Sequence, residues 1–382
     1  NKSATNARIQ ASVLSLYDSG RLKNPTKDGV DIDWNTADAE IIAELKAIKN
    51  KKDPGKIAIL SSTIISPSTK KLITEFIADY GNVKHIQMDS VSYSGMLDAN
   101  EASFGVRVLP TYNFDKAEVI VSFGADFLGN WLNADYAKDY VTARDPKNGK
   151  MAKHYQVEST LSLTGSNADD RLQIKPSEQK GLLSNLFNFL NKTTPTTDSR
   201  IEELAKDLKN NKGKSIVVCN SNDAEVQTLV NAINSELDSY ENTISLSNPS
   251  FLKQGNDVDI ATLIKEMNEE KIDALITYNV NPSYTLQNAE AYDAGLSKVG
   301  LTISTSLYND ESAQKMMYVC PDNHYLESWG DANPSNGIYT LMQPTIAPLF
   351  KGRQFQESIM TWMGNSDYHT YLQNFYSDID WN

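Results

Sequence analysis

Short buried strands alternate with amphipathic helices along most of this chain, and this alternation constrains its fold more than any other feature. Residues 56–61 form an apolar run entered through Asp53-Pro54-Gly55, which is typical of a buried parallel strand. Residues 67–80 follow with apolar side chains at helical spacing and end at Gly81. Strands that alternate with helices of about 12–15 residues indicate βαβ units around a parallel sheet.

The same rhythm recurs farther along the chain. The pattern predicts strands at 83–88, 117–123, 215–219, 273–278 and 299–303, and helices at 223–237, 257–270 and 355–363. A Thr/Pro-rich stretch at 191–197 separates two such sets, and 382 residues exceed one ordinary core. We therefore expect an α/β protein with two doubly wound parallel-sheet domains.

The charge balance excludes two classes of partner. Lys and Arg number 36 against 49 Asp and Glu, a formal charge of −13. Phosphate contacts need clustered basic residues, so we expect no binding to nucleic acid or through a polybasic membrane surface. No apolar run approaches the roughly 20 residues of a spanning helix, so we expect no direct membrane span. Because the sequence begins with Asn1, we also expect a processed product or a segment of a longer protein.

The chain has few candidate metal ligands. Its two cysteines, Cys219 and Cys320, lie far apart in the sequence, and the four histidines are scattered. A [4Fe–4S] cluster takes four thiolates, so this chain alone cannot hold one, and structural zinc lacks a ligand set. The cysteines form either a disulfide or, as we favour, two buried free thiols.

Two loops that follow strands are candidate ligand sites, because ligands of doubly wound sheets bind beyond the carboxyl ends of the strands. The first loop contains Gly124 and Asp126, and the second contains Asn279 and Asn281. Neither loop has a complete GxGxxG or a Walker lysine. The alternative reading is that these residues are ordinary turn formers, and we favour it.

Sequence patterns for catalysis are weak. The chain has no GxSxG elbow and no HExxH. His324 and Glu327 have the spacing of an acid/base pair, but one such pair is common by chance. Asp169 and Asp170, followed by Arg171, fit a solvated corner better than paired catalytic carboxylates. We expect no catalytic residue.

Several segments together resemble the catalytic domain of molybdopterin oxidoreductases. They lie in the family's order at residues 7–40, 122–126, 168–176, 274–282 and 326–330. Segments at 60–67, 90–95, 100–105, 119–128 and 159–165 more narrowly resemble the B subunits of bacterial alternative complex III.

This resemblance implies a part in a quinol-oxidising respiratory complex. The chain would be the molybdopterin-oxidoreductase-like part of that subunit, without a cofactor or enzyme activity of its own. The iron–sulfur clusters would lie in an adjoining ferredoxin-like part. Its partners would be that part, the quinol-binding membrane subunits and the cytochrome c subunits. It would lie at the periplasmic face of the bacterial inner membrane, held peripherally through these partners.

Departures from active members of the family support a cofactor-free role. No cysteine stands where a metal ligand is expected, so only Ser90 or Ser92 could ligate molybdenum. A phosphate-side motif of the family is replaced by Lys175-Pro-Ser-Glu-Gln179. Losing its glycine adds a Cβ where backbone should approach the ligand. Two alternatives stay open: an active molybdenum oxidoreductase with a serine ligand, and an α/β domain that binds a nucleotide or another small ligand.

The resemblance also implies that one domain is nested in the other. The strand near 57–61 would share a sheet with those near 215–219 and 273–278. The outer domain would comprise 1–68 plus 205–345, the nested domain 69–204, and a C-terminal extension 346–382.

Overall fold

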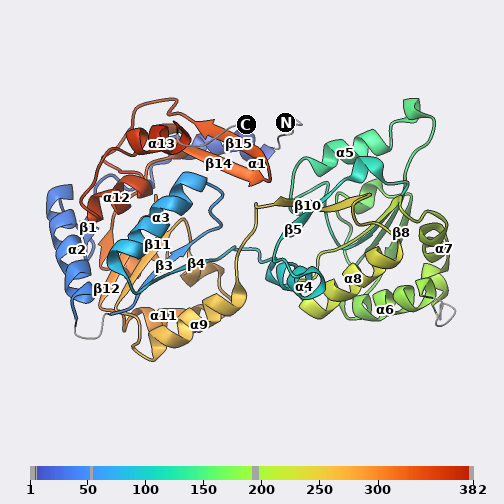
Figure 1. The fold of residues 1–382 in the computed structure, drawn as a ribbon, viewed down its shortest axis with the longest axis horizontal. Coiled ribbons are helices and arrows are strands. Elements are labelled where there is room, and N and C mark those ends of the chain that lie inside the picture. The colour runs from blue at the N-terminus through green and yellow to red at the C-terminus, as the bar shows by residue number, and fades with distance from the viewer. Residues whose placement is uncertain (1–4, 6, 52–54, 192–197, 378–382) are drawn as a thin grey trace. The chain divides into compact units, whose positions relative to one another are not determined.

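The computed structural model describes residues 5, 7–51, 55–191 and 198–377, which form two compact units, each with a largely parallel sheet (Figure 1). Unit 1 comprises residues 93–253 with the N-terminal residues up to Gln10, and unit 2 comprises 11–92 and 254–382. Along the chain, unit 1 is therefore inserted into unit 2.

Unit 2 is built on a seven-stranded sheet with the order β2-β1-β13-β12-β11-β3-β4. The strands from β13 to β4 are parallel, and β1 and β2 add an antiparallel edge. The strand bounds are β1 Thr26–Lys27, β2 Val30–Asp31, β3 Ile57–Ser61, β4 Val83–Gln87, β11 Ala274–Tyr278, β12 Leu301–Ser304 and β13 Tyr318–Val319.

Helices cover both faces of this sheet because its buried strands present apolar side chains alternately to each side. Ile57 and Ile59 belong to one core cluster, and Ala58 and Leu60 belong to another. The first cluster includes side chains of α2 (Trp34–Lys49), α3 (Pro67–Tyr80), α12 (Phe355–Trp362) and α13 (Tyr368–Ser377). The second includes side chains of α9 (Asp257–Asn268) and α11 (Ala289–Leu296). Unit 2 also contains η1 Ser12–Tyr17, α10 Pro282–Thr285, η7 Ala313–Lys315, η8 Tyr325–Glu327 and the hairpin of β14 Gly330–Ser335 with β15 Ile338–Met342.

Unit 1 has a four-stranded parallel sheet with the order β8-β7-β6-β9. A second pair, β5 with β10, is antiparallel. The strands are β5 Leu109–Tyr112, β6 Val119–Phe123, β7 Lys153–Glu158, β8 Asp170–Gln173, β9 Ser215–Cys219 and β10 Ile244–Ser250. The helices are α4 Ser94–Phe104, α5 Tyr136–Ala143, α6 Gln179–Leu190, α7 Glu202–Asn210 and α8 Ala224–Glu236, with 3-10 turns η2 Phe114–Lys116, η3 Pro146–Asn148, η4 Gly165–Asn167, η5 Pro176–Glu178 and η6 Ser199–Ile201; α1 Ala7–Ala11 lies near the start of the chain.

The unit boundaries differ from the expected ones. The inserted unit runs from 93 to 253 rather than from 69 to 204. Strand β9 pairs with β6, in register Val119↔Ser215, and not with β3, whereas β11 does pair with β3 as expected. Buried parallel strands share one apolar pattern, so the sequence does not say which sheet each strand joins.

Two further expectations need correction. The described part of the expected extension at 346–382 is not separate, because Phe355, Ile359, Trp362 and Tyr368 are buried in the core of unit 2. The Thr/Pro-rich stretch at 191–197 lies within unit 1, so it does not separate the units; residues 192–197 themselves lie outside the described part of the chain.

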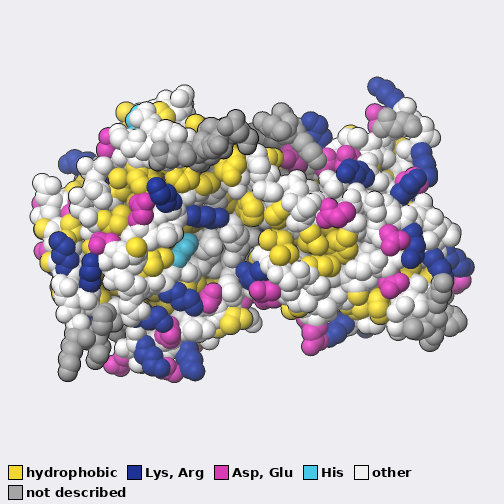
Figure 2. All heavy atoms as spheres, in the orientation of Figure 1, with side chains coloured by type: hydrophobic (Ala, Val, Ile, Leu, Met, Phe, Trp, Pro, Cys, Tyr) yellow, Lys and Arg dark blue, Asp and Glu magenta, His cyan; other side chains and the backbone are white. Residues whose placement is uncertain are grey.

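The surface carries charges of both signs. Figure 2 shows Lys and Arg side chains interspersed with Asp and Glu over the visible face. Of the helices in the described ranges, none combines the length and the apolar character needed to cross a bilayer.

Candidate functional site

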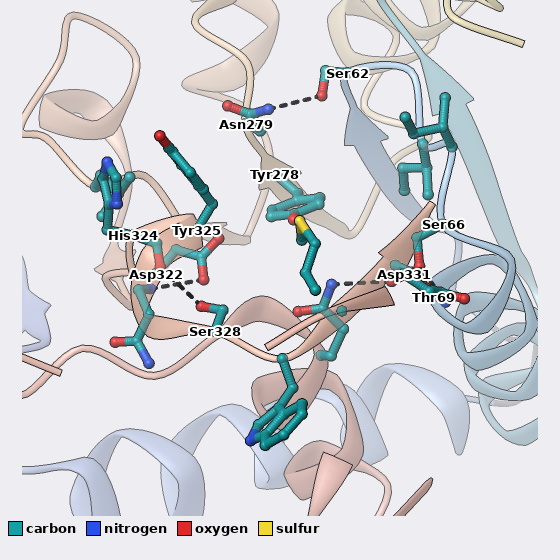
Figure 3. A pocket seen from close by; sticks show the side chains of 18 of the residues that line it. Ser62, Ser66, Thr69, Tyr278, Asn279, Asp322, His324, Tyr325, Ser328 and Asp331 are labelled. Carbon is teal, nitrogen blue, oxygen red and sulfur yellow. Dashed lines mark hydrogen bonds between the residues drawn. The ribbon is translucent and has the colours of Figure 1, made fainter. Parts of the chain in front are cut away.

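A cavity of about 390 Å³ lies at the carboxyl ends of the parallel strands in unit 2 (Figure 3). This is the edge at which doubly wound sheets bind ligands. Ser62 and Thr63 follow β3, and Tyr278 and Asn279 lie at the end of β11. The other lining residues are Ser15, Ile64, Ile65, Ser66, Thr69, Leu307, Tyr308, Asp322, Asn323, His324, Tyr325, Ser328, Trp329, Gly330, Asp331, Met342 and Gln356.

The two asparagines expected in this region have different roles. Asn279 lines the cavity in a left-handed conformation (φ 53°), and its Nδ2 donates to Ser62 Oγ at 3.1 Å. Asn281 is not among the lining residues. Its Oδ1 accepts from Ser312 Oγ at 2.7 Å, and its Nδ2 donates to Glu311 at 2.6 Å. Asn281 therefore connects two turns of unit 2.

The N-terminus of α3 faces this edge of the sheet, and its donors are already used. Thr69 N donates to Ser66 Oγ at 3.0 Å, and Ser68 N donates to Asp331 at 3.1 Å. Asp331 also accepts from the hydroxyls of Ser66, Ser68 and Tyr376. A helix N-terminus is a favourable site for an anion, and here the anion is the chain's own carboxylate.

Asp322, which follows β13, is the other carboxylate of the cavity. Its Oδ1 accepts from the backbone N–H groups of Asn323 at 2.8 Å and Phe355 at 3.0 Å. Burial raises the pKa of Asp322 to about 7, against the lowering influence of these two bonds. The ring of Tyr278 stacks on Phe355 with centroids 4.0 Å apart, which makes this side of the cavity aromatic.

His324 and Glu327 do not form a catalytic pair. The Nδ1 of His324 accepts from the backbone of Leu326 at 3.2 Å, so its Nε2 carries the proton and donates to Ser15 Oγ at 2.8 Å. A base for Ser15 would need to accept at this position. Glu327 instead forms a buried ion pair with Arg21, at 2.6 Å. Burial lowers the pKa of His324, which keeps the ring neutral.

In unit 1, the polar groups of the loop after β6 bind to other residues of the same unit. Gly124 has a left-handed φ of 70°, and a Cβ there would lie 2.8 Å from Asn220 Oδ1. Asp126 Oδ1 accepts from Thr164 N at 2.9 Å and Thr164 Oγ1 at 2.7 Å. Most backbone N–H groups of this loop donate hydrogen bonds to acceptors within unit 1. They are those of Gly124, Ala125, Phe127, Leu128, Gly129, Asn130 and Trp131. Both candidate residues thus serve the loop's own conformation.

Carboxylates also accept backbone hydrogen bonds near the starts of two helices in unit 1. Asp223 Oδ1 accepts from Glu225 N at 2.8 Å and Val226 N at 3.3 Å at the start of α8. Glu178 accepts from Lys175 N at 2.8 Å, in the turn that leads into α6. This backbone bond holds the pKa of Glu178 below its usual range. The Lys175–Gln179 segment therefore presents a carboxylate at the start of this helical region.

Other residues considered from the sequence have no catalytic arrangement. Ser92 donates to the carboxylate of Asp257 at 2.8 and 2.9 Å, and Ser90 is exposed. The described residues contain no cluster of three or more His, Cys, Asp or Glu that could hold a metal ion.

Asp169 pairs with Arg144, at 2.9 Å, which lowers the pKa of Asp169. Its neighbour Asp170 instead lies 3.6 Å from Lys153.

Both cysteines are free and buried, so the disulfide alternative is wrong. Burial raises the pKa of Cys219 to about 11 and that of Cys320 to about 12. Both are protonated thiols at neutral pH and poor metal ligands.

The sequence did not indicate Asp322, Asp331 or the aromatic lining of the cavity. Asp322 follows a two-residue strand that is too short to give a pattern. Asp331 lies in a segment rich in Gly, Pro and Asn, which reads as a loop. The sequence signal for this cavity was the end of the predicted strand at Tyr278.

Comparisons with known proteins support the fold. No protein-family model matches the chain. The menaquinone reductase molybdopterin-binding-like subunit of Nitratidesulfovibrio vulgaris (strain Hildenborough) is 22% identical over 411 residues, which cover 92% of this chain and 58% of that protein. Acetylene hydratase from Pelobacter acetylenicus superposes with a TM-score of 0.72 at 13% identity, over 98% of this chain and 66% of that one.

The chain spans less than two thirds of the length of either protein. The structural match confirms the expected mixed α/β fold with parallel sheets. The chain therefore shares the molybdopterin oxidoreductase-like fold of acetylene hydratase.

Proposed function

We propose that this chain belongs to a membrane-associated, quinone-linked respiratory complex of the alternative complex III type. It would form a structural part of one subunit and bind no cofactor. Its relative is named as a subunit of a menaquinone reductase, and this name supports a place in a quinone-linked complex. The chain would pack against an iron–sulfur part and cytochrome subunits and hold their redox centres within electron-transfer distance. It would lie at the periplasmic face, bound through those partners.

One observation supports the cofactor-free proposal: the chain's own carboxylates lie at helix starts, which are favourable sites for a phosphate group. Asp331 occupies the start of α3, Asp223 that of α8, and Glu178 the turn before α6. A pterin dinucleotide carries several negative charges and needs free N–H groups and basic side chains. A carboxylate at each of these positions repels that ligand, and Asp331 and Asp223 also accept from N–H groups that it would need.

Molybdenum ligation finds equally little support. The alkoxide form of Ser92 would lie beside the carboxylate of Asp257, and two negative charges in contact oppose deprotonation. The residues present therefore do not fit the molybdopterin group. The active-enzyme alternative, with Ser90 or Ser92 as ligand, has no geometric support in the described residues. Without a redox centre, this part of the complex would carry no electrons itself.

Elemental analysis of the purified complex tests this proposal. We expect iron but neither molybdenum nor tungsten, and no fluorescence of oxidised pterin from the same sample. A molybdopterin enzyme carried through the same protocol serves as the positive control. Stoichiometric molybdenum with pterin would contradict the proposal, and Ser90→Ala and Ser92→Ala would then be the first variants to assay for quinol oxidation.

A further inference from the structure

The cavity of unit 2 has a lining that the proposed structural role does not use. Four aromatic side chains, those of Tyr278, Tyr308, Tyr325 and Trp329, share it with the carboxylate of Asp322. In Figure 3, Asp322 and Tyr325 lie on one side of the cavity, Asp331 lies on the opposite side, and Tyr278 lies between them. At about 390 Å³, the space suits a small organic group.

The lining favours a positive ligand over a negative one. Among the described residues that line the cavity, none is lysine or arginine, whereas Asp322 and Asp331 are both acidic. His324 is neutral, because its Nδ1 accepts a backbone N–H. Arg21 lies near this region, but it is paired with Glu327 in a buried ion pair. A nucleotide phosphate would meet only negative or neutral side chains here.

The two carboxylates differ in what they can offer a ligand. Asp331 already accepts from four donors, three at the start of α3 and the hydroxyl of Tyr376 in α13. Asp322 accepts its two backbone N–H groups through Oδ1, and its Oδ2 has no donor among the described residues. Asp322 can therefore act as the counter-ion for a positively charged group.

We propose that this cavity binds a monovalent organic cation, an ammonium or guanidinium group, between its aromatic rings and Asp322. Aromatic faces attract such cations through their quadrupoles, and the attraction grows when the cation is desolvated. A carboxylate supplies charge-assisted hydrogen bonds to N–H groups. The cation is either a free small molecule or a basic side chain of a partner, which present the same chemistry to the site. The site does not depend on the proposed respiratory role.

Calorimetric titration of the purified chain at pH 8, where the Asp322 carboxyl group is ionised, tests this proposal with matched probes. Choline represents a free small cation, N-acetyl-L-argininamide represents a basic side chain, and 3,3-dimethylbutan-1-ol is the uncharged analogue of choline. We expect saturable binding of at least one cation and binding of the uncharged analogue that is weaker by about tenfold or more. Tighter binding of choline would identify a small molecule as the source, and tighter binding of the argininamide would identify a partner's side chain.

Three variants locate the site. Asp322→Asn keeps an oxygen acceptor for the two backbone N–H groups but removes the charge, and we expect it to weaken cation binding by about tenfold or more. Tyr325→Leu removes a ring that is 44% exposed, so the fold should tolerate it while affinity falls several-fold. Tyr284→Leu, at an exposed tyrosine outside the cavity lining, is the matched control and should leave affinity unchanged.

Several results would overturn the proposal. These are no cation binding, equal affinity for choline and its uncharged analogue, binding of guanosine monophosphate in place of a cation, or full affinity in both folded variants, Asp322→Asn and Tyr325→Leu. Circular dichroism establishes that each variant is folded before titration.

Discussion

Replacing Asp322 with Asn should stabilise unit 2 at alkaline pH, which is unusual for a change at a partly buried polar residue. The folded environment raises the pKa of Asp322 from 3.8 to about 7, chiefly through burial. Glu357 acts in the same direction, and Arg21 acts against it. Well below pH 4 the carboxyl group is protonated in both the folded and the unfolded chain, so Asp322 does not lower the stability of the folded state there. As the pH rises toward 7, the unfolded chain releases this proton before the folded chain does, and stability is lost.

The size of this effect follows from linkage. A shift from 3.8 to about 7 corresponds to about 4 kcal/mol above pH 7, since one pKa unit is worth about 1.36 kcal/mol. Asp322 keeps some contact with solvent in the cavity, and water there screens its charge, so we expect about 2 kcal/mol in practice. Asparagine at this position keeps the Oδ1 acceptor for Asn323 and Phe355 without the charge.

Urea denaturation of both proteins at several pH values measures this difference, and hydrogen exchange in β11 and β12 assigns it to unit 2. We expect Asp322→Asn to be more stable at pH 8 and most of this advantage to be lost by pH 4. Other carboxylates titrate equally in both proteins, so they cancel in the difference. The reasoning is refuted if the variant gains nothing at pH 8, or if its advantage is the same at both pH values.

Two further substitutions test the internal contacts of each unit. Glu327→Ala leaves Arg21 buried without its partner, and it should lower the free energy of unfolding, measured by urea denaturation, by about 3–5 kcal/mol. Replacing both Arg21 and Glu327 with Met should recover much of that loss. Additive effects of the single changes would contradict this expectation. Gly124→Ala forces a Cβ against Asn220 at a positive φ and should destabilise unit 1 by about 1–3 kcal/mol; an unchanged denaturation midpoint would show that the loop relaxes freely.

Local structure could be predicted well where its causes are local. The helix expected at 67–80 matches α3 because Ser66 caps it, Pro67 occupies its first turn and Gly81 ends it. The grouping of strands into sheets could not be predicted in this way. The apolar patterns of β9 and β11 are equivalent, yet β9 pairs in unit 1 and β11 in unit 2. Pairing depends on contacts that no local window contains.

The candidate site was predicted only in part, for the same reason. Of the four loop residues singled out in the sequence, Asn279 lines the cavity, and Gly124, Asp126 and Asn281 shape turns. Asp331 acts on Ser68 across 263 residues of sequence. A contact of that range has no signature in the spacing of residues, although its chemistry, a carboxylate at a helix N-terminus, is general.

The carboxylates at the helix starts have a consequence for how this fold is stabilised. In an enzyme that binds a nucleotide at such a helix, the phosphate satisfies the dipole, so stability rises with ligand concentration. In this chain the side chain of Asp331 makes that interaction from within the same molecule. Its local concentration is fixed by the fold, and α3 needs no ligand to complete its first turn. A chain whose proposed role is to hold other subunits in place benefits from this arrangement, because its stability then depends on no cofactor supply.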